Sequence, residues 1–127
     1  MLINIPVIED YRGNIGVVQN GEFPFDFKRI YYLFDVPSSA SRGGHAHLNQ
    51  DACLIALSGS FEVILDNGVQ KTTYFLNKPN IGLHIQKGIW RELDNFSSGA
   101  VCLVVASDVF DERDYIRNYD DFLKSKV

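Results

Sequence analysis

The residues best suited to chemistry gather in one short run, Arg42-Gly43-Gly44-His45-Ala46-His47. Side chains alternate between the two faces of a β-strand, so His45 and His47 point to the same face if this run is a strand. An imidazole titrates near neutral pH and can both accept and return a proton. The guanidinium of Arg42 suits a phosphate group, and the two glycines let backbone and ligand approach closely. The run therefore predicts a site for proton transfer or ligand binding, with a purely structural histidine pair as the alternative.

Short strands surround this run. Six segments are rich in β-branched and aromatic residues, and turn residues separate them, among them Asn67-Gly68, which predicts a tight hairpin. Short strands without helices between them predict an all-β fold, a small β-barrel or sandwich in one domain spanning residues 1–127. The expected strands are Phe27–Phe34, Cys53–Leu57, Ser60–Leu65, Thr72–Leu76, Ile81–Gln86 and Val101–Ala106.

The last segment has a different pattern. Between Asp111 and Lys124, the apolar residues Tyr115, Ile116, Tyr119 and Phe122 recur at spacings that predict a short C-terminal helix lying on the barrel. Aspartates in the turns and at the expected start of this helix are predicted to cap and solvate, without a chemical role. They are Asp66, Asp108, Asp111 and Asp114.

Composition narrows the possible partners. The net charge of −4 and the pI near 5.2 argue against general binding to nucleic acid or to an anionic membrane. The apolar start of the chain lacks a basic region and a cleavage site, which argues against secretion. Cys53 and Cys102 lie in apolar strand-like runs and are expected to be buried thiols. The sequence therefore predicts a cytoplasmic protein.

A His-x-His pair on a barrel strand resembles half of the metal site in metal-binding cupins. In those proteins a Glu follows the pair, and a third His comes from a second motif. Here Ala52 and Arg91 stand at the corresponding positions, although a different register through Asp51 or His84 remains open. Alanine cannot ligate, and a permanent cation repels a divalent ion. We therefore expect neither a metal nor another cofactor.

A broader resemblance is carried by three motifs, which are the Arg-Gly-x-His-Ala-His string, the segment Lys28–Asp35 before it and the segment Asp111–Tyr119 after it. Together they resemble the sugar-nucleotide 3,4-ketoisomerases, small cupins that act on dTDP-4-keto-6-deoxyglucose. The likeness extends from Arg12 to Phe122. It implies a cupin-type jelly roll with a short C-terminal helix.

The resemblance implies that the ketone of a dTDP-linked 4-keto-6-deoxyhexose moves from C4 to C3 through an enediolate, for amino-sugar biosynthesis. One histidine would abstract the C3 proton, with His47 preferred because it lies further along the strand, while His45 handles the other protons. Tyr31 or Tyr32 would donate to the enediolate oxygen, and alternation allows only one of them to point inward.

The nucleotide and a second subunit complete this interpretation. Arg42, Arg29 and Arg91 are candidates for the diphosphate, and Trp90 for the sugar or the base. The resemblance implies a homodimer with exchanged N-terminal strands, in which Arg12 reaches the neighbour's pocket. Two alternative functions stay open: a 3,5-epimerase of a keto-sugar nucleotide and a non-catalytic sugar-binding cupin.

Overall fold

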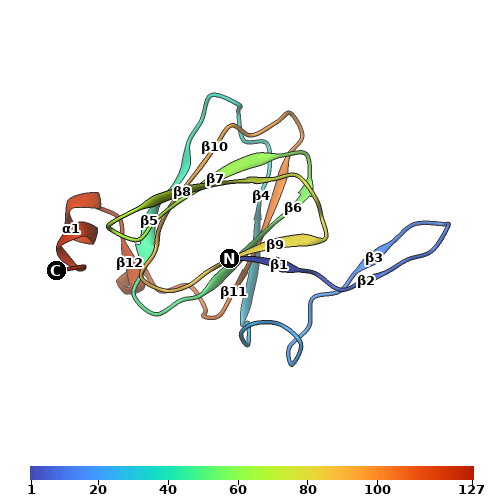
Figure 1. The fold of residues 1–127 in the computed structure, drawn as a ribbon, viewed down its shortest axis with the longest axis horizontal. Helices are drawn as coiled ribbons and strands as arrows, with labels where there is room; N and C mark the ends of the chain where they lie inside the picture. Colours follow the sequence, from blue (N-terminus) through green and yellow to red (C-terminus); the bar gives the residue numbers. More distant parts are fainter.

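The computed structural model describes residues 1–127, and its two five-stranded sheets face each other (Figure 1). The strand orders are β1-β9-β6-β11-β4 and β12-β5-β10-β7-β8, every pairing is antiparallel, and β2 and β3 form a separate hairpin. The predicted all-β jelly roll is confirmed. The strands are β1 (Leu2–Asn4), β2 (Val7–Ile8), β3 (Ile15–Gly16), β4 (Arg29–Leu33), β5 (Arg42–His47), β6 (Ala52–Ser58), β7 (Phe61–Asp66), β8 (Lys71–Leu76), β9 (Ile81–Ile85), β10 (Trp90–Asp94), β11 (Val101–Ala106) and β12 (Tyr115–Ile116).

The main core lies between the two sheets, where alternate residues of facing strands meet. Leu54 of β6 and Val63 of β7 are buried there, and the rings of Phe61 and Phe96 stack at 5.1 Å. The predicted hairpin at Asn67-Gly68 joins β7 to β8. Because β10 carries three charged residues in five, its sequence lacks strand periodicity, and only the structure reveals it.

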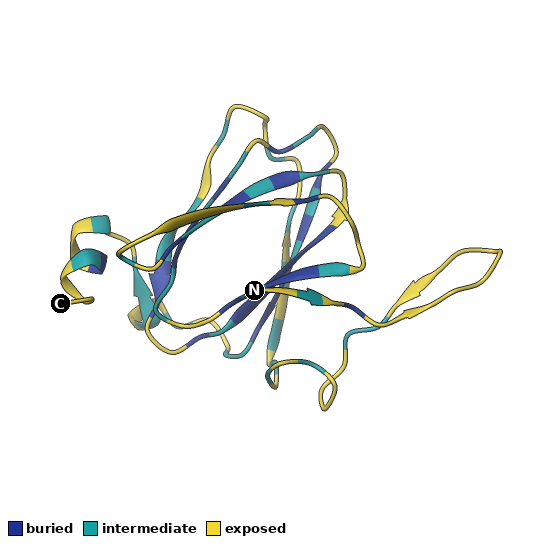
Figure 2. Ribbon diagram, in the orientation of Figure 1, coloured by how far each residue is buried: buried dark blue, intermediate teal, exposed yellow.

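A second core covers the outer face of the first sheet. Cys53, Ile55 and Val105 point outward from β6 and β11 and are covered by apolar side chains of residues 17–27. The segment before it, β2 and β3, extends away from the sheets (Figure 1), and the burial colouring shows it as mostly exposed (Figure 2). Tyr11 at its tip is 96% exposed.

The C-terminal segment is not one helix from Asp111, so this prediction was wrong over its first half. A 3₁₀ turn, η1 (Glu112–Asp114), leads into β12, and only Tyr119–Lys124 form α1. Pairing with β5 overrides the helical pattern, because Tyr115 lies opposite His47 and Ile116 opposite Ala46. Asn118 then caps α1 by accepting the backbone N–H of Asp121.

Both cysteines are free and buried, which confirms the prediction of buried thiols. Burial raises the pKa of Cys53 and of Cys102 to about 12. The single α-helix is far too short to span a bilayer.

Candidate functional site

A cavity of about 390 Å³ opens between the β4 edge of the first sheet and β5 with β12 of the second. Inward-facing side chains of β4, β5, β10 and β11 line it, together with residues from the segment that follows β11. Four of the lining residues are arginines and none is acidic. In a chain of net charge −4, this cavity is a local site for an anion.

His45 reaches into the cavity from β5. Its Nδ1–H donates to the carbonyl oxygen of Gly43 at 2.9 Å, whereas Nε2 is buried and has no hydrogen-bond partner. The main-chain bond leaves the lone pair on Nε2. Burial and the charge of Arg91 lower the pKa of His45 to about 3, so the imidazole is neutral at pH 7. His45 therefore presents an unprotonated nitrogen to whatever occupies the cavity.

The two glycines before His45 shape the strand around it. The β5–β10 register shifts between Arg91 and Glu92, and Gly43 and Gly44 have φ values of +92° and +56°. A Cβ on Gly43 would stand 3.1 Å from the carbonyl oxygen of Arg91. Gly44 has nothing within 4 Å of such an atom and does not line the cavity, so its role is the bulge.

His47 lies behind His45 and does not line the cavity, although the sequence favours it as the carbon base. Its side chain is completely buried. Its Nδ1–H donates to Oδ2 of Asp114 at 2.9 Å, and its Nε2 accepts from the amide of Gln50 at 3.3 Å. Burial and the charges of nearby arginines lower its pKa. With both nitrogens occupied, His47 has no lone pair to offer a substrate.

Two arginines lie deep in the cavity and two lie at its rim. Arg91 is 3% exposed, and its Nε has no partner. Burial lowers the pKa of Arg91 to about 10, which keeps it charged at pH 7. The Nε and Nη2 atoms of Arg29 are also buried without a partner, with the guanidinium 4.6 Å from the ring centre of Tyr31. Arg42 and Arg117 are exposed.

The structure resolves which tyrosine of the pair points inward. Tyr31 alternates with Arg29 and Leu33 on the cavity side of β4, and burial raises the pKa of its hydroxyl. Tyr32 points outward, is 61% exposed and reaches only the rim. Trp90 does not line the cavity, because it precedes the inward-facing Arg91 on β10 and packs beneath α1.

Three residues without a predicted chemical role belong to this site, and the prediction that Asp114 is a solvated capping residue was wrong. Tyr115 and Arg117 line the cavity, and Asp114 holds His47. The ring centroid of Tyr115 lies 5.0 Å from that of His45 and 4.4 Å from that of His47. All three stand in the Asp111–Tyr119 motif, but the helix predicted there would point these side chains in other directions. Pairing of β12 with β5 is what brings them to the histidines.

The side chains here do not fit a metal ion. No cluster of three histidine, cysteine or carboxylate residues is arranged to hold one. Arg91 lies opposite His45 in the strand pairing, where its positive charge opposes a divalent cation. His84 and Asp51, the residues of the alternative register, contact each other at 3.2 Å, and His84 lines a separate depression beside Met1.

Comparisons with known proteins agree on one family. The family model described as "FdtA: WxcM-like, C-terminal" matches residues 1–127. The chain is 44% identical over 126 residues to the TDP-4-oxo-6-deoxy-alpha-D-glucose-3,4-oxoisomerase of Aneurinibacillus thermoaerophilus, covering 97% of this chain and 89% of that protein.

Solved structures agree. A 3,4-ketoisomerase from Helicobacter canadensis superposes with a TM-score of 0.95 at 44% identity, covering 99% of this chain and 96% of that one. A point mutant of the 3,4-ketoisomerase QdtA from Thermoanaerobacterium thermosaccharolyticum, in complex with TDP-4-keto-6-deoxyglucose, superposes with a TM-score of 0.96 at 37% identity, covering 99% and 92%. A dTDP-4-dehydrorhamnose 3,5-epimerase from Bacillus anthracis, at 14% identity and a TM-score of 0.77, shares the fold alone.

Proposed function

Because the chain belongs to the FdtA/WxcM-like C-terminal family, whose relatives include TDP-sugar 3,4-ketoisomerases, we propose that it moves the ketone of TDP-4-keto-6-deoxyglucose from C4 to C3. One observation carries the assignment to this cavity. Every buried side-chain nitrogen without a partner in the structure belongs to Arg29, His45 or Arg91, and all three residues line the same cavity. Buried polar atoms are rarely left unpaired, so these nitrogens are the natural contacts of a bound ligand.

In the proposed reaction, Nε2 of His45 takes the proton from C3, which the neighbouring C4 ketone acidifies. The electron pair of the C3–H bond forms an enediolate over C3 and C4. A proton is then delivered to C4, the C3 hydroxyl gives up its proton, and O4 takes one. The product is the C3 ketone with a C4 hydroxyl, and no oxidant or reductant is consumed.

The geometry favours His45 over His47 as the base, contrary to the sequence-based preference. Only His45 has a bare nitrogen in the cavity, whereas both nitrogens of His47 are bonded within the protein. The buried guanidinium of Arg91 faces the place where negative charge develops, and Tyr31 supplies a hydroxyl donor. His47 is assigned a supporting role.

The substrate's diphosphate is assigned to the rim of the cavity. Arg42 from β5 is exposed there without an acidic partner, and its guanidinium can bind phosphate oxygens in two-pronged fashion. Arg117 after β12 adds positive charge at the same rim, with its Nε and Nη2 bonded to Glu112. Arg29, an earlier candidate for the diphosphate, lies among buried groups and is better placed to contact the sugar oxygens. No such role is proposed for Trp90 or Gly44, which do not line the cavity.

The test is proton NMR of the chelator-treated protein with TDP-4-keto-6-deoxyglucose in deuterated water. A new 3-keto sugar supports the proposal, and the coupling of any proton retained at C4 gives its configuration. Deuterium exchange at C5 would instead identify a 3,5-epimerase. An unchanged spectrum with saturable binding would identify a sugar-binding protein.

A pair of histidine variants refines this test. His45→Asn is expected to lower kcat by about 10²–10⁴-fold, the usual contribution of a general base, while TDP binding persists. His84→Asn is the matched control, because His84 lies outside the cavity. Unimpaired turnover by His45→Asn would refute the assignment of the base.

We also propose a cytoplasmic homodimer with exchanged N-terminal strands. The β2–β3 hairpin carries exposed Ile8 and Ile15 and makes no sheet contact with the rest of its own chain. On this hairpin Arg12 is 74% exposed and bonds only Asp10, which leaves it available to a neighbour's cavity. Light scattering that finds only a 14.4 kDa species would refute the dimer.

Complementation tests the exchange directly. If Arg12 completes the partner's cavity, subunits of Arg12→Ala and His45→Asn, each impaired alone, regain activity when refolded together. A mixture no more active than its components would refute the exchange.

A 3-keto product would suit an aminotransferase, in keeping with a role in amino-sugar biosynthesis.

A further inference from the structure

We propose that Asp114 is a positioning residue for the isomerase reaction, holding His45 in place through His47 and Tyr115. The inference rests on the proposed function. It assigns a role to a carboxylate outside the cavity, in η1, that does not touch the substrate.

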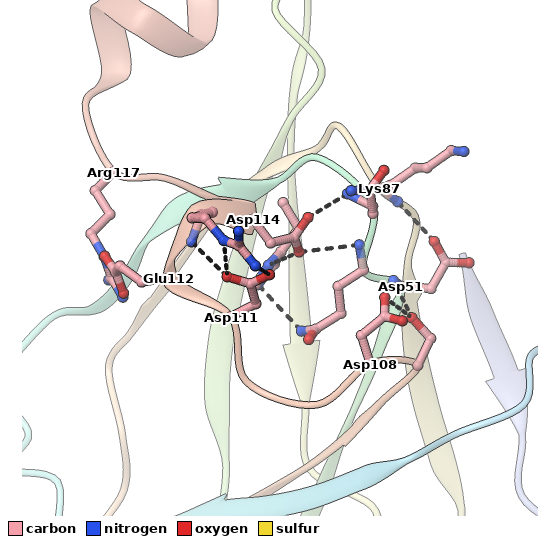
Figure 3. A network of polar contacts seen from close by, with 12 residues as sticks. Asp51, Lys87, Asp108, Asp111, Glu112, Asp114 and Arg117 are labelled. Carbon is pink, nitrogen blue, oxygen red and sulfur yellow. Dashed lines mark hydrogen bonds and ion pairs between the residues drawn. The ribbon is translucent and has the colours of Figure 1, made fainter.

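Asp114 ties the end of β5 to the segment that carries Tyr115. Its Oδ1 accepts the backbone N–H of Asn49 at 2.7 Å, and its Oδ2 accepts both Nδ1–H of His47 at 2.9 Å and the backbone N–H of Gln50 at 3.3 Å. Its carbonyl oxygen accepts the N–H of Leu48 at 2.9 Å. Figure 3 shows Asp114 within this polar network. The carboxylate side chain is only 11% exposed, so water competes little for it.

The contacts continue from Asp114 to the proposed base in two ways. The ring of His47 stands edge-on to that of His45, with centroids 4.8 Å apart and planes at 89°. Tyr115, the next residue after Asp114, places its ring 5.0 Å from His45. The two rings that pack against His45, those of His47 and Tyr115, therefore both depend on the Asp114 carboxylate.

Asp114 also determines which nitrogen of His47 carries the proton. The carboxylate can only accept, so Nδ1 must donate, and Nε2 then accepts from the amide of Gln50. An asparagine at 114 has only one side-chain oxygen. If that oxygen keeps the Asn49 N–H, its amide group faces Nδ1 of His47, and the ring must move its proton to Nε2 or rotate. Asp114→Asn keeps the volume of the side chain and changes the hydrogen bonding alone.

The test compares Asp114→Asn with Asp111→Asn, the same substitution three positions earlier. The side chain of Asp111 is 44% exposed and bonds only the backbone and side chain of Arg113, and asparagine caps as well as aspartate. Asp114→Asn is expected to lower kcat on the order of 10–100-fold, the cost of a misplaced catalytic group, with TDP affinity within about twofold of wild type. Asp111→Asn should keep wild-type kcat.

Two further readouts separate positioning from a general structural role. The ¹⁵N NMR signals of His47 should change from the Nδ1–H to the Nε2–H pattern in Asp114→Asn. In a double-mutant cycle, the loss of kcat in the double variant Asp114→Asn/His47→Gln should be smaller than the product of the two single losses, because part of the effect of Asp114 passes through His47. If Asp114→Asn does not fold, Gln50→Leu removes the donor at the other ring nitrogen and is expected to lower kcat in the same way.

Wild-type kcat in Asp114→Asn, losses that multiply in the cycle, or loss of TDP binding along with kcat would each overturn the proposal. If the wild-type protein does not isomerise the sugar, the proposed function fails, whereas the His47 tautomer still reports whether Asp114 controls that ring.

Discussion

Acidification is expected to destabilise this fold through His45. The ring is neutral in the folded protein, where burial and the charge of Arg91 lower its pKa from 6.5 to about 3. In the unfolded chain the ring regains its ordinary pKa and takes up a proton more readily. The contribution of the neutral His45 ring to the unfolding free energy is therefore present above pH 6.5 and is lost as the pH falls from 6.5 towards 3.

The size of the effect follows from these two values. One pKa unit corresponds to about 1.4 kcal/mol, so lowering the pH from about 7.5 to about 5 costs about 2 kcal/mol of unfolding free energy through this ring. His47 contributes in the same direction, because burial and the charges of nearby arginines lower its pKa to about 3 as well. His45 has no acidic partner, which makes it the cleaner probe.

Urea denaturation of wild type and His45→Asn at both pH values measures this contribution. Trp90 is the only tryptophan and is 4% exposed, so its fluorescence reports unfolding. At a fixed protein concentration, the unfolding free energy of wild type should fall by about 2 kcal/mol more than that of the variant between the two pH values. The exposed carboxylates are the same in both proteins, so their contribution to the change in unfolding free energy cancels in the comparison. An equal loss in both proteins would refute the reasoning.

Three further substitutions test the cavity and the packing around it. Arg42→Gln should weaken TDP binding about tenfold by removing a charged hydrogen bond, as titration calorimetry would show, whereas Arg113→Gln outside the cavity should not. Gly43→Ala should destabilise the fold by about 1–3 kcal/mol in urea melts, because its φ of +92° disfavours a side chain. Phe122→Ala should cost about 3–5 kcal/mol by emptying the contact between α1 and Trp90, with little change in KM.

Strand periodicity was sufficient to predict most of the fold. The six expected strands all form, because their β-branched and aromatic residues suit a pleated surface that is buried on at least one side. The same reasoning failed where tertiary pairing decides the backbone. Residues 115 and 116 fit a helical pattern but pair with β5, and this pairing brings Tyr115 to the cavity.

The candidate site was predicted in part for a similar reason. Alternation predicted that His45 shares a face with His47 and that one of Tyr31 and Tyr32 points inward, and the structure brings His45 and Tyr31 to one cavity. Arg91 was a candidate from its place in the motif, and only the structure shows the strand that points it inward. Alternation does not say where along a strand the cavity ends, and His47 was preferred as the base because it lies further along the strand. The partners of each nitrogen separate the two histidines, and those partners come from residues that are distant in sequence, such as Asp114.

The charge of the cavity leads to a last prediction, about the strength of the base. The Arg91 cation that would stabilise an enediolate also lowers the pKa of His45, as do His47 and Arg117, so the free enzyme has a weak base. A bound diphosphate brings negative charge to the arginine-lined cavity and favours protonation of His45, which raises its pKa. The acid limb of kcat, which reports the substrate complex, should therefore lie at higher pH than the acid limb of kcat/KM, which reports the free enzyme. Coincident limbs in the two profiles would mean that the diphosphate does not act on the base through the charge of the cavity.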